Sequence, residues 1–435
     1  MRIKIAGGRL IDPQNQIDAQ QDVYVAAGRI AAIGKAPEGF VADQTIDAQG
    51  LIVCPGLVDL SARLREPGYE YKATLESELR AAVAGGVTSL ACPPDTDPAL
   101  DEPGLVEMLK HRARQLHLAH VYPVGALTQG LQGEAITEMA QLVEAGCVAF
   151  SQADQPIVNT QTLQRALQYA RTFNYVVWLR PQDPWLGRHG VAHAGAMAGR
   201  MGLSGVPVAS ETVALHTIFE LLRAAGSRTG SRGQTARVHL CRLSSAAGLE
   251  LVRTAKAEGL PVSCDVGIHH VHLTDVDMGY FNSQYRLNPP LRAQEDRAAI
   301  VRALQDGTID AICSDHTPVD DDAKQQSFAE AEAGATGLEV LLPLTLRWAE
   351  QEKLPLAQAL SKITTMAARV LGIDAGHLSL GAVADLCVFD PHAAWRVAPT
   401  ALISQGRNSP FLGYEMVGRV RYTLVEGKLV YGQTP

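Results

Sequence analysis

The stretch that decides the fold runs from Pro261 to Cys313 and contains PVSCDV at 261–266, RAQEDRAAIVRALQ at 292–305 and DAIC at 310–313. The first and third runs are short and apolar, as buried strands are. The second run spaces its apolar residues three and four positions apart, which is typical of a helix with one buried face. A strand, a helix and a second strand in this order predict a parallel βαβ unit.

The same alternation recurs along the middle of the chain. Eight apolar runs are strand candidates: Leu57–Leu60, Thr88–Cys92, His120–Val124, Cys147–Phe150, Val176–Leu179, Arg237–Cys241, Pro261–Val266 and Asp310–Cys313. Helical spacing follows most of them, as in Ala73–Ala84, Thr160–Thr172, Ser210–Ala225, Ala246–Glu258 and Arg292–Gln305. We therefore predict an α/β fold with a (β/α)8 TIM barrel over residues 54–380, whose chemistry lies at the C-terminal ends of the strands.

Both ends of the chain contain strand patterns without helices. The candidates are Arg2–Ile5, Val23–Ala26, Arg29–Ile33, Gln44–Ile46, Leu51–Val53, Leu386–Phe389, Val420–Val425 and Leu429–Tyr431. Strand-rich ends around a differently patterned middle suggest that the termini meet. We predict a small β-sandwich domain built from residues 1–53 and 381–435.

Composition excludes several classes of protein. The chain has 38 Lys and Arg against 46 Asp and Glu, a net charge of −8 without a basic block, which argues against a nucleic-acid partner. No run reaches the roughly 18 apolar residues of a membrane helix, and the N-terminus lacks the apolar core of a signal peptide. The seven cysteines include no C-x-x-C pair and are predicted to be reduced core residues. We expect a cytoplasmic protein with no membrane partner.

Several motifs together resemble the dihydroorotase branch of the amidohydrolase superfamily. In chain order they are DAQGLIVCPGLVD at Asp47–Asp59, LREPG at Leu64–Gly68, NPPLR at Asn288–Arg292, SDHTP at Ser314–Pro318 and GLE at Gly337–Glu339. The resemblance spans nearly the whole chain. It implies the barrel fold and an ancestry among metal-dependent enzymes that hydrolyse cyclic amides.

The positions that the resemblance equates with metal ligands do not carry ligands. They fall at Ser61, Arg63, Gln152 or the adjoining Ala153, Arg180 and Arg242, and of the family's set only the acid Asp315 is retained. Arginine keeps its proton and cannot bind zinc. A guanidinium about 4 Å from a dication opposes it by roughly 8 kcal/mol at an effective dielectric of about 20. We predict no metal, no cofactor and no catalytic residue, with Asp315 a vestige that pairs with an arginine.

Substrate recognition also departs from the family pattern. Arg65 and Asn288 match positions that bind the substrate carboxylate, and we interpret both as vestigial. The family has an asparagine where this chain has Asp95, and an acid there opposes an acidic substrate. The family's loop histidine is replaced by Val319.

The resemblance implies a function without catalysis. Some bacterial aspartate transcarbamoylases assemble with dihydroorotase or with an inactive homologue of it. We therefore expect a catalytically inactive, dihydroorotase-like subunit in pyrimidine biosynthesis, with the aspartate transcarbamoylase catalytic chain as its partner and with self-association into a homo-oligomer.

Two alternatives stay open. One is an active cyclic amidohydrolase with a displaced metal site at Asp315 and His269–His272, where alternation along a strand would place His270 and His272 on one side. The other is an effector sensor in which Arg63, Arg65, Arg180 and Arg242 bind an anion. Against the second alternative, we favour internal neutralisation of these arginines by the acidic residues Asp154, Asp183 and Asp315.

Four further segments carry predictions. Ser244-Ser245 is interpreted as a helix N-cap, and His189 and His193 are placed in a surface loop. Gly226–Gly233 is similar to a phosphate loop but lacks the Gly-Lys-Ser/Thr ending, so a solvent loop is favoured. Val319–Thr336 is acidic and rich in alanine, and is predicted to be disordered.

Overall fold

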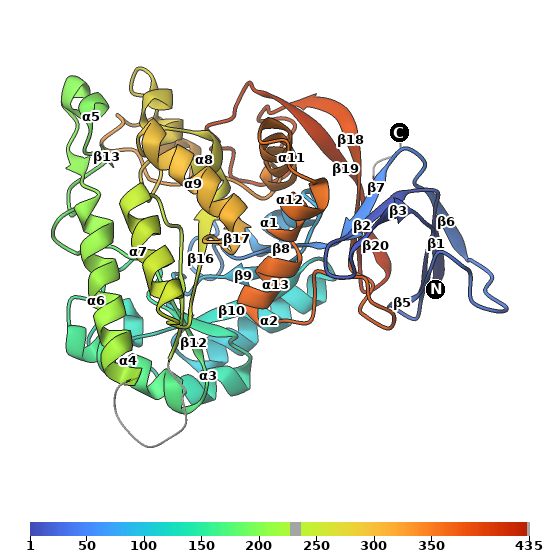
Figure 1. Cartoon of the computed structure of the whole chain (residues 1–435), viewed down its shortest axis with the longest axis horizontal. Coiled ribbons are helices and arrows are strands. Elements are labelled where there is room, and N and C mark those ends of the chain that lie inside the picture. The colour runs from blue at the N-terminus through green and yellow to red at the C-terminus, as the bar shows by residue number, and fades with distance from the viewer. Residues whose placement is uncertain (227–235, 433–435) are drawn as a thin grey trace.

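Eight parallel strands form a nearly closed barrel in the computed structural model, which describes residues 1–226 and 236–432 (Figure 1). The barrel strands are β8 (Leu57–Asp59), β9 (Val87–Cys92), β10 (His120–Ala126), β11 (Ala149–Ser151), β12 (Val176–Leu179), β15 (Arg237–Leu240), β16 (Val262–Gly267) and β17 (Ala311–Cys313). Each predicted strand is present, with ends displaced by two residues at most. The predicted (β/α)8 architecture is confirmed.

The helices that follow the strands cover the outside of the barrel (Figure 1). They include α1 (Leu75–Ala84), α2 (Pro103–Leu116), α3 (Met139–Ala145), α4 (Thr160–Thr172), α6 (Ala209–Gly226), α7 (Ala246–Ala257), α9 (Gln294–Asp306), α11 (Leu341–Gln351) and α12 (Leu356–Ser361). Ser245 is the N-cap of α7, and its hydroxyl accepts a hydrogen bond from the Gly248 amide, as predicted. Such a cap satisfies one of the amide groups that a helix leaves unpaired at its start.

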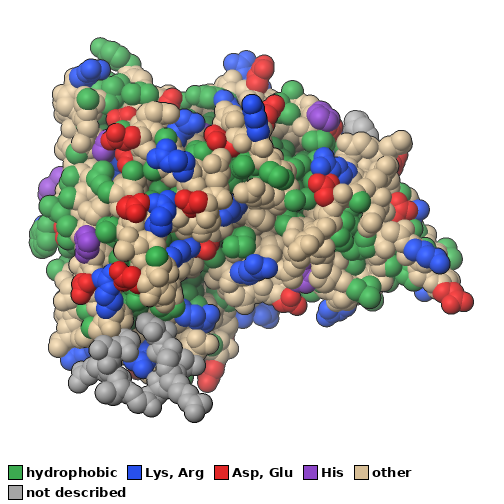
Figure 2. Space-filling view, in the orientation of Figure 1, with side chains coloured by type: hydrophobic (Ala, Val, Ile, Leu, Met, Phe, Trp, Pro, Cys, Tyr) green, Lys and Arg blue, Asp and Glu red, His purple; other side chains and the backbone are tan. Residues whose placement is uncertain are grey.

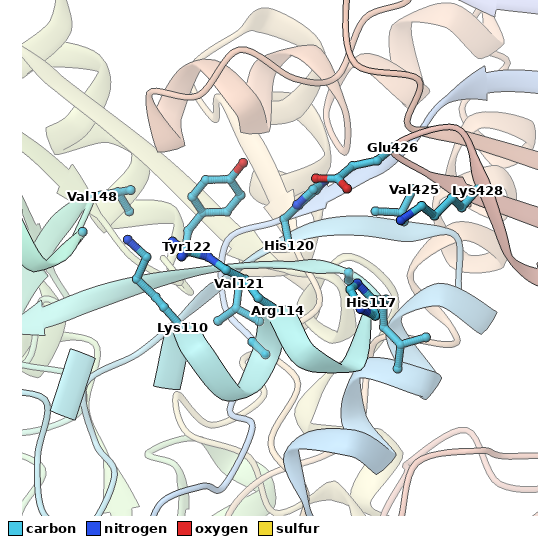
Figure 3. A pocket seen from close by; sticks show the side chains of 14 residues that line it. Lys110, Arg114, His117, His120, Val121, Tyr122, Val148, Val425, Glu426 and Lys428 are labelled. Atoms are coloured by element: carbon cyan, nitrogen blue, oxygen red, sulfur yellow. The ribbon is translucent and has the colours of Figure 1, made fainter. Parts of the chain in front are cut away.

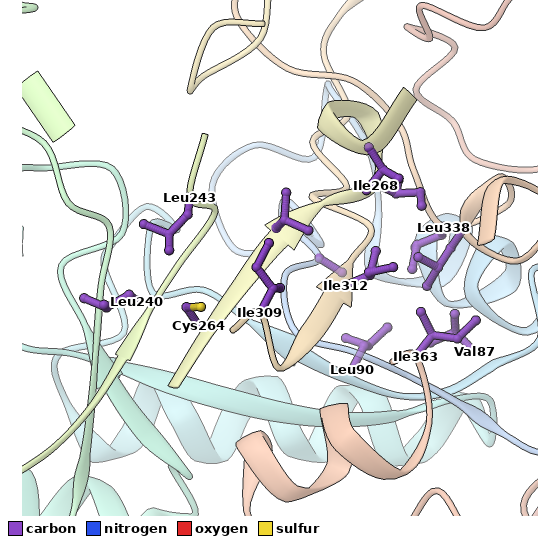
Figure 4. Packing of buried hydrophobic residues seen from close by; sticks show 14 of the residues in the cluster. Val87, Leu90, Leu240, Leu243, Cys264, Ile268, Ile309, Ile312, Leu338 and Ile363 are labelled. Carbon is purple, nitrogen blue, oxygen red and sulfur yellow. The ribbon is translucent and has the colours of Figure 1, made fainter. Parts of the chain in front are cut away.

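Two apolar layers follow from the alternation of side chains along each strand. In β9, Leu90 faces the outer cluster between the strands and the helices, whereas Ala91 belongs to the inner cluster. Figure 4 shows part of the outer cluster, with Ile312 of β17 beside Leu90 and Ile363. Helix α13 (Thr365–Leu371) contributes Ala367, Ala368 and Leu371 to the inner cluster.

The first and last barrel strands meet along an incomplete seam. The Val58 amide donates to the Ile363 carbonyl at 2.8 Å and the Ile312 amide donates to the Lys362 carbonyl at 3.1 Å, so a chain segment lies between β8 and β17. Backbone pairing occurs above the strands, at the bridge between Ala62 and His316, and the Asp59 carboxylate of β8 accepts the Ser314 amide and hydroxyl, both at 2.6 Å. There the His316 amide donates to the Ser61 carbonyl at 3.0 Å.

The two ends of the chain build one β domain, as predicted. One sheet contains β1 (Arg2–Ala6), β4 (Val23–Ala26), β5 (Arg29–Ile33) and β6 (Gln44–Asp47). The other contains β2 (Arg9–Asp12), β3 (Ile17–Gln20), β7 (Ile52–Pro55), β18 (Leu386–Arg396), β19 (Glu415–Val425) and β20 (Lys428–Gly432). Ile3 and Ile46 of the first sheet share a buried cluster with Val53 and Leu386 of the second. The exact boundaries at 53 and 381 stay a prediction.

The segment Val319–Thr336 is ordered, which corrects the prediction of disorder. It contains the short helix α10 (Asp321–Lys324), and Phe328 and Ala331 are buried. The Asn408 side chain donates to the carbonyls of Thr317 and Gly334 at the two ends of the segment, at 2.9 and 3.0 Å. Apolar anchors therefore outweigh the polar composition of this segment.

The prediction for His189 and His193 is half wrong. His189 is exposed, but His193 is buried in strand β13 (Ala192–His193), with Nδ1 3.1 Å from Nη1 of Arg292. The glycine-rich stretch at 226–233 lies outside the described residues beyond Gly226.

The surface and the cysteines agree with the composition. Lys and Arg are interspersed with Asp and Glu over the face shown in Figure 2. Within the described residues, no helix combines the length and the apolar character needed to cross a membrane. All seven cysteines are free and six are buried, as predicted for core residues.

Candidate functional site

Charged side chains from several strand ends converge at the C-terminal mouth of the barrel. They are Arg63 after β8, Asp95 after β9, Asp154 after β11, Arg180 after β12, Arg242 after β15 and Asp315 after β17. Arg242 and Asp315 adopt left-handed backbone angles, with φ of 54° and 48°. That conformation costs a side-chain-bearing residue roughly 1–2 kcal/mol, so the surrounding contacts hold both in place.

Asp154 is the centre of this arginine network. Its carboxylate accepts hydrogen bonds from Nη2 of Arg63 at 2.9 Å and from Nη2 of Arg242, and Nε of Arg180 lies 3.7 Å from Oδ1. Asp315 Oδ1 accepts from Nη1 of Arg242 at 2.9 Å and lies 3.7 Å from Nη1 of Arg63. The predicted pairing of Asp315 with an arginine is present, and so is neutralisation by Asp154.

The third predicted counter-charge is a different residue. Asp183 Oδ1 accepts the amides of Trp185 and Leu186 at 2.9 and 2.8 Å, so it caps a turn, and it forms no ion pair with an arginine among the described residues. Asp95 takes this role, because its Oδ2 accepts from Nε of Arg63 at 2.7 Å. The substitution that opposes an acidic substrate therefore supplies a charge that the network needs.

Burial and pairing act against each other on these groups. The side chains of Arg63, Arg180 and Arg242 are only 5, 6 and 5% exposed. Burial alone would raise the pKa of the Asp154 carboxyl, but Arg242, Arg63 and Arg180 hold it below its ordinary value. Burial lowers the pKa of Arg180 to about 10, because Asp154 only partly compensates. Asp154 and Arg180 are thus charged at neutral pH, whereas at Asp315 burial outweighs Arg242 and Arg63 and raises the pKa of the carboxyl above its ordinary value.

The other predicted site residues also have internal partners. Arg65 Nε donates to the Pro318 carbonyl at 2.9 Å, and Asn288 Oδ1 accepts from Nη2 of Arg180 at 2.6 Å. Both lie at the mouth, as expected from the sequence. Gln152 has its partners outside the ion network: its side-chain oxygen accepts from the Thr128 hydroxyl, and its side-chain amide donates to the Leu131 carbonyl.

Ser61 is buried beside the network, and its carbonyl accepts the His316 amide. It lines a small cavity of about 30 Å³ together with Arg63, Cys241, Arg242 and Asp265. A space of this size holds a water molecule or two but not a pyrimidine ring.

The three neighbouring histidines do not form a cluster. They lie in the short helix α8 (Ile268–His272) and not on a strand, because β16 ends at Gly267. His269 stacks on Phe411, with ring centroids 5.8 Å apart. His270 Nε2 lies 3.3 Å from the Pro290 carbonyl, and His272 Nε2 lies 2.9 Å from the Leu344 carbonyl. The predicted placement of His270 and His272 on one side of a strand is wrong.

One other group of potential ligands occurs among the described residues. His239, Cys241 and Asp265 bring one ligand atom each within 4.8 Å of the others. Two of the three residues already have partners, because His239 Nε2 is 2.9 Å from Asp265 Oδ2 and Asp265 Oδ1 accepts the Arg242 amide at 2.6 Å. A dication would have to break these bonds. The sequence marked His239 only as a strand residue, and its spacing to Asp265 gave no signal.

The mouth does not fit the zinc centre that the resemblance implies. Zinc requires neutral imidazoles or anionic ligands at about 2.0–2.3 Å. Here the converging groups are guanidiniums, which cannot ligate, and the carboxylates of Asp154 and Asp315 already bind them. The arrangement is a fixed ion network.

Sequence comparisons agree with the motifs. Residues 50–230 match the family described as dihydro-orotase-like, and residues 212–430 match the amidohydrolase family. A dihydroorotase-like protein of Pseudomonas aeruginosa is 45% identical over 99% of this chain and 100% of its own length. The chain belongs to the dihydroorotase-like family. Other family members include a dihydroorotase of Geobacter sp. strain M21, which is 41% identical over 99% of both chains.

Solved structures extend the likeness of this dihydroorotase-like chain at the level of fold. The L-hydantoinase (dihydropyrimidinase) from Arthrobacter aurescens superposes with a TM-score of 0.85, covering 99% of this chain and 96% of the other at 24% identity. A D-hydantoinase superposes with a TM-score of 0.82 at 20% identity, covering 100% and 96%. Identities this low support the shared fold only.

Proposed function

We propose that this dihydroorotase-like protein lacks hydrolytic activity and acts as a structural subunit. The observation that carries the proposal is the arginine network, in which Arg63, Arg180 and Arg242 converge on Asp154 and Asp315. Metal-assisted amide hydrolysis needs an activated water and a polarised carbonyl. Guanidiniums cannot hold the metal or accept a proton, and Asp315 is bound to Arg242.

The partner we propose is the catalytic chain of aspartate transcarbamoylase, in pyrimidine biosynthesis. The resemblance supports it, because some of these bacterial enzymes assemble with dihydroorotase or an inactive homologue. A barrel mouth whose arginines are paired with carboxylates suits a scaffold that does not process a substrate. We also propose self-association into a homo-oligomer.

Activity and metal content test the first proposal. Purified chain should show neither dihydroorotate hydrolysis nor carbamoylaspartate cyclisation, with well under one metal ion per chain by elemental analysis. The Geobacter dihydroorotase, purified in parallel, is the comparison protein. Turnover that survives repeated purification and disappears with a chelator would overturn the proposal.

Co-expression with aspartate transcarbamoylase tests the second. The two chains should co-purify, and the size or transferase activity of the assembly should depend on this chain. A transferase that is fully active and correctly assembled alone would contradict the structural role, while leaving the loss of hydrolysis intact.

The two alternatives are weakened by particular contacts. A displaced metal centre needs converging histidines, whereas the rings of His269, His270 and His272 contact Phe411, the Pro290 carbonyl and the Leu344 carbonyl in turn, although His269 Nε2 and His270 Nδ1 have no hydrogen-bond partner among the described residues. An anion sensor needs free arginines, whereas those at the centre of the mouth are paired. For the anion sensor, titration of the chain with carbamoylaspartate should give no heat. For the displaced metal site, Cys241→Ser should lower the metal content of the purified chain only if the ion lies beside His239.

A further inference from the structure

A cavity of about 510 Å³ lies at the N-terminal end of the barrel, opposite the arginine network (Figure 3). Its walls come from the last turns of α2, the start of β10 and the turn between β19 and β20. The barrel contributes Lys110, Arg114 and Tyr122, and the β domain contributes Glu426 and Lys428. We call this space the interdomain cavity. Its size is within the range of about 300–1,000 Å³ typical of small-molecule sites.

The charge of the interdomain cavity is predominantly positive. Three permanent cations, Lys110, Arg114 and Lys428, face one carboxylate, that of Glu426. Within the described part of the chain, neither Arg114 nor Lys428 forms an ion pair. Lys110 donates one hydrogen bond to the Ala145 carbonyl at 3.1 Å, which leaves further N–H groups available. A concave surface with this excess of positive charge attracts anions.

One contact fixes the two domains around the cavity. His120 Nε2 lies 3.1 Å from Asp385 Oδ2, and Asp385 Oδ1 accepts the Glu426 amide at 2.8 Å. Burial lowers the pKa of His120, but the hydrogen bond and charge of Asp385 outweigh it and raise the pKa above its ordinary value. The turn that carries Lys428 is therefore held against β10, and the walls exist before a ligand arrives.

Apart from the imidazoles of His117 and His120, the remaining lining is mostly apolar. Val121 and Val148 are half-buried, Val425 is buried, and the half-buried Tyr122 ring forms part of the same wall. Figure 3 shows Tyr122 between Lys110 and His120 along the cavity. Surfaces of this kind favour a flat apolar group, since an aromatic ring gains contact area at little entropic cost.

We propose that the interdomain cavity binds an organic phosphate. The phosphate would contact Arg114 and Lys428, and the flat organic part would lie against Tyr122 and Val148. Guanidinium and ammonium groups are the side chains that bind phosphate most strongly. This site is remote from the mouth, so the proposal does not depend on whether the chain hydrolyses anything.

Isothermal titration calorimetry of the full chain tests the proposal with three probes: phenyl phosphate, inorganic phosphate and phenol. Phenyl phosphate should bind more tightly than inorganic phosphate, and phenol should give no heat. The double variant Arg114→Ala/Lys428→Ala should weaken phenyl phosphate binding about tenfold or more, since two charge-assisted hydrogen bonds are lost. The control variant Lys35→Ala/Arg200→Ala removes two exposed cations elsewhere and should bind as the unaltered chain does.

A second variant separates shape from charge. Val148→Trp fills the cavity without removing a cation and should also weaken binding, with the circular dichroism spectrum unchanged. The proposal is overturned if phenyl phosphate gives no heat at millimolar concentration, or if the double variant binds it as tightly as the control. Equal binding of phenyl and inorganic phosphate would also overturn it, because it would reduce the cavity to a charged surface.

Discussion

The two ends of the barrel differ in whether their cations are buried and paired with carboxylates. At the C-terminal end, Arg63, Arg180 and Arg242 are buried and face carboxylates. At the other end, Arg114 and Lys428 are exposed and have no carboxylate partner among the described residues. A buried guanidinium is tolerated only with a counter-charge, whereas an exposed one needs none. The comparison indicates that cations at the mouth hold the structure, and that cations at the interdomain cavity are free to bind a ligand.

The largest expected effect comes from removing the central arginine of the mouth. Arg242→Ala removes the guanidinium that binds both Asp154 and Asp315, and leaves the buried Asp315 with Arg63 at 3.7 Å as its remaining ion-pair partner, so the free energy of unfolding should fall by about 3–5 kcal/mol. Urea unfolding followed by fluorescence measures it. Lys428→Ala, at the opposite end, is the control and should change it by less than about 0.5 kcal/mol. A loss below about 1 kcal/mol for Arg242→Ala would break the comparison.

Acid should distinguish the ion network from the adjacent helix α8. Burial lowers the pKa values of His269, His270 and His272 to about 3, 4 and 3, from an ordinary value near 6.5. The unfolded chain therefore binds more protons between pH 6.5 and about 4, and stability falls as the pH falls through that range. The pKa of Asp154 is lowered, so its contribution persists until the pH drops below the ordinary value of an aspartate.

A histidine variant tests this assignment. His272→Gln keeps a donor for the Leu344 carbonyl but cannot titrate, so the slope of unfolding free energy against pH should become smaller by about 1.4 kcal/mol per pH unit. His189→Gln, at an exposed position, is the matched control and should leave the slope unchanged. An unchanged slope for His272→Gln would show that this residue is protonated in the folded state.

The smallest expected effect is at the interdomain cavity without a ligand. Arg114→Ala/Lys428→Ala should leave the melting temperature within about 1 °C of the unaltered chain, because surface substitutions of this kind rarely exceed 0.5 kcal/mol. A clear loss of stability would mean that these cations have structural partners, and the two barrel ends would then differ less than we infer.

The fold was predictable where burial imposes a pattern. Parallel strands covered on both faces appear as continuous apolar runs, so the eight barrel strands stood out. Strands β2 and β3 were not predicted. Strand β3 is a short edge strand with exposed Asp18, Ala19 and Gln20, and β2 is a run of only four residues. Helix α8 was interpreted as a continuation of the preceding strand, since nothing local marks the turn at Gly267.

The site was predictable as far as barrel topology brings residues together. Strand ends converge in any such barrel, so the meeting of Arg63, Arg180 and Arg242 with Asp154 and Asp315 followed from the order of the motifs. The choice of Asp95 in place of Asp183 depends on the direction of two loops, which the sequence did not specify. The interdomain cavity was not predicted, because residues more than 300 positions apart build it.

The arginine network also helps to hold the barrel closed at the seam between β8 and β17. Other neighbouring barrel strands are joined by a ladder of backbone hydrogen bonds, whereas these two pair at the bridge between Ala62 and His316. Next to this bridge, Arg63 forms an ion pair across the seam, with its Nη1 3.7 Å from Asp315 Oδ1. Arg242 stabilises this ion pair by binding the same carboxylate. Local opening of the barrel should begin at this seam. If the ion pair between Arg63 and Asp315 is lost, amide hydrogen exchange at Arg63 and His316 should accelerate first.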